Sequence, residues 1–121
     1  MAPPSALVIA TQSVQRLVKE ETYYHKELVG QKVRVQKLED GLKNGSADAD
    51  QNAEYVLRQE KMAAAETEKM FGPLRERISD AVRKLEEQIA LGESEGAGDE
   101  ELAKAREALK AGQLVAGTEE V

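Results

Sequence analysis

Residues 7–42 read LVIATQSVQRLVKEETYYHKELVGQKVRVQKLEDGL, and one heptad repeat runs through the whole stretch. With Leu7 taken as position a, positions a and d hold Leu7, Ala10, Val14, Leu17, Glu21, Tyr24, Leu28, Gln31, Val35, Leu38 and Leu42. Alternating steps of three and four residues are typical of a helix whose apolar seam winds around another helix. Because Glu21 and Gln31 would weaken a seam paired with a copy of itself, the pattern favours packing against the rest of the same chain.

Turn-forming residues divide the chain into three predicted helices. Pro3 and Pro4 are expected to precede the first helix, with Ser5 as its N-cap. The segments GLKNGSADAD and GESEGAGD provide the two loops, and Asp99 is the predicted N-cap of the last helix. The predicted elements are helices at about 5–42, 49–91 and 99–115 and a flexible tail at 116–121. Gly112 and Gly117 predict fraying at the end of the third helix.

The second predicted helix carries a broad apolar stripe that is interrupted by Gly72-Pro73. Its apolar residues are Leu57, Ala64, Phe71, Leu74, Ile78, Ala81 and Leu85, widened by Val56, Met70, Val82 and Ile89. Proline inside a helix removes one backbone hydrogen bond and costs about 3 kcal/mol. A break between two helices and a kink within one helix both fit this interruption. Since the heptad phase continues unchanged from Phe71 to Ile78, a kink at 72–73 is favoured.

These features predict an all-α fold: an elongated, antiparallel three-helix bundle with coiled-coil-like packing, formed by residues 1–121 as one domain. The third helix is long enough to cover only about half of the hairpin that the first two helices form. It is expected to cover residues 7–17 and 78–89. Five apolar residues would then be thinly covered, namely Val33, Val35, Leu38, Val56 and Leu57. We hypothesise that they belong to a partner or dimer surface.

Composition excludes several classes of function. The 121 residues include no cysteine and one histidine, His25, which is predicted to be exposed, so a metal site of the usual kind and a catalytic triad are not expected. The net charge of −6 argues against a nucleic-acid partner. No signal peptide or long apolar span is present, which predicts no membrane partner and a cytoplasmic location. We therefore expect neither an enzyme nor a bound cofactor.

Charge is unevenly distributed along the chain. The first helix is locally basic, whereas residues 86–101 contain acidic residues and neither lysine nor arginine. The basic residues are Arg16, Lys19, Lys26, Lys32, Arg34 and Lys37. Ordinary solvated helix faces explain this pattern, and so does a basic face that steers an acidic partner.

Three segments together resemble the tubulin-binding cofactor A family. They are SVQRLVKEETYYHKEL (13–28), EKMFGPLRERISDAVRKLEEQI (68–89) and DEELAKAREALK (99–110). Their order and spacing and the proline within the second helix correspond to the family over residues 12–111. The resemblance implies a chaperone of the cytoplasm and cytoskeleton that binds folding intermediates of β-tubulin after their release from chaperonin. It also implies transfer towards the αβ-tubulin dimer, with other tubulin-folding cofactors as further partners and a monomeric or homodimeric state.

By position, the resemblance assigns candidate client-binding residues and a structural proline. The candidate residues are Arg16, Lys19, Glu20, Tyr24, Lys26, Glu27 and Arg77, and Pro73 is the expected kink. Leu17, Val18, Met70, Leu85, Ala105 and Arg106 also match the family. Packing is the competing interpretation for Leu17, Tyr24, Met70 and Leu85, and a solvated face is the competing one for the charged residues. The alternative function is a structural coiled-coil module that homo-oligomerises and tethers other proteins.

Overall fold

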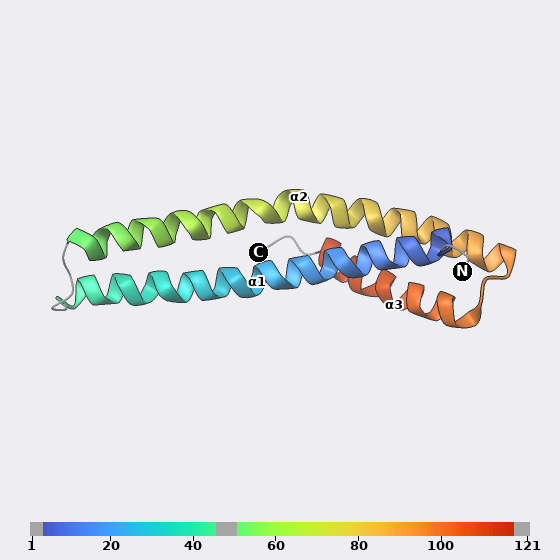
Figure 1. The fold of residues 1–121 in the computed structure, drawn as a ribbon, viewed down its shortest axis with the longest axis horizontal. Helices are drawn as coiled ribbons and strands as arrows, with labels where there is room; N and C mark the ends of the chain where they lie inside the picture. Colours follow the sequence, from blue (N-terminus) through green and yellow to red (C-terminus); the bar gives the residue numbers. More distant parts are fainter. Residues whose placement is uncertain (1–3, 46–50, 118–121) are drawn as a thin grey trace. The chain divides into compact units, whose positions relative to one another are not determined.

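The computed structural model describes residues 4–45 and 51–117, and these residues form three α-helices without any strand (Figure 1). The helices are α1 (Ala6–Lys43), α2 (Gln51–Glu95) and α3 (Asp99–Ala116). This arrangement confirms the all-α class and the predicted extent of the first helix. Because α2 continues through Pro73, the chain has one helix here and not two. A kink at this proline stays a prediction.

Helix ends agree with the sequence analysis in part. Ser5 caps α1, since its Oγ accepts a hydrogen bond from the amide of Val8 at 3.2 Å. The assignment of Asp99 as an N-cap is wrong: Gly98 takes that position with extended backbone, and Asp99 begins the first turn of α3. Here the acidic side chain interacts favourably with the helix dipole instead of capping it. The predicted start of the second helix near 49 lies outside the described residues, as do residues 118–121 of the tail predicted at 116–121, whereas Ala116 is still the last residue of α3.

The second helix ends four residues later than predicted, at Glu95 and not near 91. Gly96 has a φ of +77°, a conformation that glycine adopts without strain, and so makes the turn that ends α2. The amide of Ala97 then donates a hydrogen bond to the carbonyl of Gly92 at 2.8 Å, as in a Schellman motif. The glycine that ends α2 is therefore the second one in GESEGAGD.

The chain forms two compact units, which we describe separately. The three-helix unit comprises residues 1–21 and 72–121, and the hairpin unit comprises residues 22–71. Because α1 and α2 each contribute to both units, the division does not separate two continuous segments of sequence.

The three-helix unit buries apolar residues from all three helices. Its core consists of Leu7, Val14, Leu17, Leu74, Ile78, Ala81, Val82, Leu85, Ile89, Leu102, Ala105 and Ala108. Near Gly92 the side chains of Leu7 and Leu102 meet, whereas near Gly112 those of Val14 and Val82 meet. Residue numbers therefore rise together along α1 and α3 and fall along α2. In this unit α2 is antiparallel to both of its neighbours, as predicted.

Gly112 allows α3 to pack closely, so the expectation that it marks a frayed end is wrong. It is buried, and α3 continues past it to Ala116. A Cβ atom built on Gly112 would lie 2.7 Å from Cγ2 of Val82 and 2.9 Å from Cγ1 of Val14. Only glycine fits at such a distance without displacing its neighbours.

The hairpin unit packs α1 against α2 around a small apolar cluster. Leu28, Ala64 and Phe71 are buried in it, and Tyr24 packs against them. The ring of His25 lies 4.6 Å from that of Phe71, so the prediction of an exposed histidine is wrong. His25 directly flanks the seam, where its ring can cover the edge of this thin core.

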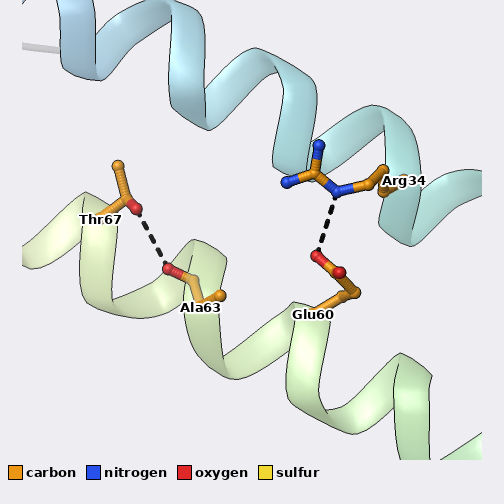
Figure 2. Close-up of polar contacts among 4 residues, drawn as sticks. All are labelled: Arg34, Glu60, Ala63 and Thr67. Atoms are coloured by element: carbon orange, nitrogen blue, oxygen red, sulfur yellow. Dashed lines mark hydrogen bonds and ion pairs between the residues drawn. The ribbon is translucent and has the colours of Figure 1, made fainter.

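Ion pairs join the two helices of the hairpin unit. Lys32 pairs with Glu68 at 3.4 Å and Glu39 pairs with Lys61 at 3.1 Å, which gives the antiparallel order. Figure 2 shows a third contact, in which Nε of Arg34 donates to Glu60 at 3.3 Å. In the same view the hydroxyl of Thr67 donates to the carbonyl of Ala63 at 3.1 Å, so this buried hydroxyl is satisfied within α2. The three ion pairs are partly exposed, and each contributes at most about 1 kcal/mol to the stability of the protein.

The seam predicted from the heptads is buried even where it is polar. Gln31 and Glu21 are only 5% and 7% exposed. The five positions expected to be thinly covered are indeed partly exposed, with Val33 the most open at 47%. Met70, predicted to widen the apolar stripe, is instead 42% exposed. It lies on the flank of the stripe, and no third helix belongs to the hairpin unit to cover it.

Replacing Gln31 with leucine is expected to stabilise the protein by about 1–2 kcal/mol. The Oε1 atom of Gln31 is buried and accepts no hydrogen bond from the described residues. The substitution removes an acceptor that lost its water on folding and adds apolar surface to the seam. Urea unfolding followed by circular dichroism measures the change. A destabilised Gln31→Leu variant would contradict the prediction and indicate that the amide has a structural role.

Candidate functional site

The structure brings two of the seven candidate residues, Arg16 and Arg77, to one groove of the three-helix unit. Lys19 and Glu20 also belong to this unit but do not line the groove. The other three lie in the hairpin unit, where Lys26 is exposed, Glu27 is half-buried and Tyr24 packs in the apolar cluster. The candidates therefore do not form one site.

The groove lies between α1 and α2 and has a volume of about 560 Å³. We call it the α1–α2 groove. Its lining residues are Ala6, Ile9, Ala10, Ser13, Arg16 and Leu17 from α1 and Arg77, Asp80, Ala81, Lys84, Glu87 and Gln88 from α2. No residue of α3 is among them. The groove is thus an uncovered side of the α1–α2 pair.

The helical repeat explains why this side stays open. Successive residues of an α-helix point about 100° apart, so residues 9, 13 and 16 share a face that residues 8, 11 and 15 do not. Val8, Thr11 and Gln15 line a separate hollow together with α3 residues Glu100 and Lys104. In this way α1 turns one side to α3 and the other to the α1–α2 groove.

The floor of the groove is made of apolar and small side chains. Leu17 and Ala81 are buried, Ala10 is half-buried, and Ile9 is 52% exposed. Alanine and serine leave room for a second surface to approach the helix backbones closely. Ile9 adds one exposed apolar side chain to the edge of this channel.

The edges of the groove carry an excess of unneutralised positive charge. Arg16, Arg77 and Lys84 form no ion pair within residues 4–45 and 51–117. Of the two acidic lining residues, Asp80 pairs with Arg83 on its own helix, which leaves Glu87 to oppose the three cations. A protein with a net charge of −6 therefore presents a locally basic groove.

The basic face predicted for the first helix is smaller than its sequence indicates. Lys32 and Arg34 are neutralised by Glu68 and Glu60 of α2. Of the six basic residues predicted for this face, Arg16, Lys19, Lys26 and Lys37 form no ion pair with any described residue. Arg106, another residue that matches the family, pairs with Glu93 at 2.7 Å and joins α3 to α2.

Sequence reasoning missed Lys84 and Ile9 as members of the groove. Both follow a signal that was present: Lys84 lies one heptad after Arg77, and Ile9 lies one heptad before Arg16. Residues that lie beside the seam and are seven positions apart line the same edge of a helix pair. Leu17 and Leu85 are buried as expected of packing residues.

The described residues contain no group of three or more His, Asp or Glu side chains that could hold a metal ion. Within the same ranges, no helix is long and apolar enough to cross a membrane.

Comparison with known proteins gives one family. The profile of the family described as tubulin binding cofactor A matches residues 2–109. No curated protein sequence and no solved structure matches the chain significantly. The matched range includes all of α1 and α2 and most of α3, and with them every candidate residue named above. The chain therefore belongs to the tubulin-binding cofactor A family.

Proposed function

We propose that the protein holds folding intermediates of β-tubulin after their release from chaperonin and passes them towards the αβ-tubulin dimer. The observation that carries the proposal is the family match over residues 2–109. Other tubulin-folding cofactors are the expected next partners, and the cytoplasm and cytoskeleton are the expected location. Holding a client requires a binding surface and no catalytic group, so we propose that the protein is not an enzyme.

Charge supports this assignment of the client. Tubulin is strongly acidic, and Arg16, Lys19 and Lys26 of α1 have no ion pair in the described residues. Opposite charges on two surfaces raise the rate at which they associate. On this basis Arg16, Lys19, Lys26 and Arg77 are candidate client-binding residues, whereas Glu20 and Glu27 are candidates only by their match to the family. Tyr24 is the weakest of the original seven, because it packs in the cluster around Phe71.

Capture of chaperonin-released β-tubulin by the purified protein tests the proposal, with α-tubulin as the control. Selective capture of β-tubulin is the expected result. If a well-folded, helical protein captures neither tubulin, the proposal is wrong and a coiled-coil tether becomes the better interpretation. Sedimentation velocity of the same sample then shows whether the chain homo-oligomerises, as a tether of that kind requires.

Binding of β-tubulin is expected to weaken by about tenfold as salt rises from low to physiological concentration. The exposed cations of α1 lie at the surface, where mobile ions screen them. Anisotropy of labelled β-tubulin at several salt concentrations measures this dependence. An affinity and an association rate that both stay constant would show that charge does not steer the client.

A further inference from the structure

We propose that the α1–α2 groove of the three-helix unit docks an amphipathic helix whose apolar stripe is flanked by carboxylates. The inference rests on the proposed function in so far as this helix belongs to the β-tubulin client. The argument for the helix itself comes from the length, floor and charge of the groove.

The groove has the length of a short helix. On α1 it extends from Ala6 to Leu17, and on α2 from Arg77 to Gln88. Each edge therefore spans eleven residue steps, on the order of 16 Å along the helix axis. That length corresponds to about three turns of a docked helix. A compact small molecule would occupy only part of a channel of this length.

The floor allows two helix backbones to approach closely. Ala10, Ser13 and Ala81 present small side chains, while Ile9 and Leu17 provide apolar surface. Helix α3 uses the same device on its own contact with the unit, where Ala105, Ala108 and Gly112 are buried. A helix seated in the α1–α2 groove would complete a four-helix arrangement around the same core.

The charge of the edges selects the partner. Arg16, Arg77 and Lys84 have no ion pair with any described residue, so their charges are available to a ligand. Arginine forks bind carboxylates with two parallel hydrogen bonds, which favours glutamate or aspartate beside the apolar stripe. A helix with lysine at those positions would be repelled. Charge complementarity thus identifies an acidic amphipathic helix as the occupant.

The probe is a pair of designed peptides of about eighteen residues, long enough to form a helix on binding. Both carry leucine at heptad spacing, and their flanks carry glutamate in one and lysine in the other. Fluorescence anisotropy with the full chain measures binding. The glutamate peptide is expected to bind about tenfold more tightly than the lysine peptide. Equal affinities for the two peptides would overturn the proposal.

Charge reversal at the groove provides the matched variants. Arg16→Glu/Arg77→Glu is expected to bind the glutamate peptide about tenfold more weakly than the unmodified chain does, and to bind the lysine peptide more tightly. Arg58→Glu/Lys110→Glu makes the same change in net charge at exposed residues outside the groove and outside the basic face of α1, and we expect it to bind like the unmodified chain. Since all four side chains are exposed, circular dichroism should show unchanged helicity. An equal loss of affinity in both variants would show that only net charge matters.

The same variants separate this inference from the proposed function. If the unmodified chain binds the glutamate peptide but not β-tubulin, the groove is correct and the client is wrong. If Arg16→Glu/Arg77→Glu captures β-tubulin as well as the unmodified chain does, the groove inference fails and the proposed function stands. A dimer in sedimentation velocity that dissociates only in the groove variant would identify a second copy of the chain as the occupant and overturn the proposal.

Discussion

The Phe71→Ala variant is expected to lose about 3–5 kcal/mol of its free energy of unfolding. Phe71 is 1% exposed and is the largest buried side chain in the cluster that joins α1 to α2 in the hairpin unit. Its removal leaves a cavity beside Leu28 and Ala64 and takes away the ring against which His25 packs. Because small domains are stable by only about 5–15 kcal/mol, this loss removes a large share of the total stability, and the hairpin unit should open far more often.

Tyr55→Ala is the matched control for this experiment. Tyr55 is an aromatic residue of the same helix and the same unit, but it is 53% exposed. Its replacement should change stability by at most about 0.5–1 kcal/mol. Urea unfolding gives the two free energies, and amide hydrogen exchange localises the loss to residues 22–71. Similar losses in both variants would show that the Phe71 cluster does not hold the hairpin together.

The Gly112→Ala variant is expected to be about 1–3 kcal/mol less stable, although alanine is the better helix former. The new methyl group would lie 2.7 Å from Val82 and 2.9 Å from Val14. Both valines are buried, and their branched side chains have few alternative rotamers, so α3 must move away from the unit. The movement should lower the protection of α3 amides in hydrogen exchange as well as the melting temperature.

Gly30→Ala tests the same substitution where space is available. Gly30 lies within α1, and the nearest side-chain atom to an added Cβ is the flexible end of Arg34, at 3.7 Å. Here helix propensity alone should act and stabilise the protein by about 0.5–1 kcal/mol. The two variants are thus expected to have opposite signs. Stabilisation by Gly112→Ala would mean that α3 packs less closely than the structure indicates.

The apolar seam of α1 packs against other helices of the same chain. Val14 and Leu28, both at position a, pack in the three-helix unit and in the hairpin unit respectively. A homodimer through this seam would have to displace α2 from α1. The surfaces left for partners are therefore the flanks of the helices, and among these the α1–α2 groove combines apolar floor with uncompensated charge.

Local pattern determined the helices, the loops, the seam and the family. A repeat of three and four residues places Leu7, Val14 and Leu28 on one side of a helix whatever the partner, and the glycine-rich segments end helices because of their own backbone preferences. The family resemblance, and not the heptad pattern, singled out Arg16 and Arg77, and it did not show that they share a groove. The physical cause of these features is local, because helix periodicity and glycine backbone preferences depend only on residues that are near one another in the sequence.

Contacts between helices decided which side chains are buried, and the spacing of residues along the sequence does not contain this information. From the sequence, Gly112 is interpreted as a weak point of a helix. In the structure Val14 and Val82, which are distant in sequence, lie so close to it that no side chain fits there. The sequence predicts Met70 as part of the apolar stripe, but no third helix of its unit covers it. His25 is half-buried because Phe71 lies beside it. Helix periodicity assigns each residue to a face, whereas the approach of other helices decides whether that face is buried, and this is why the groove appears only in the folded chain.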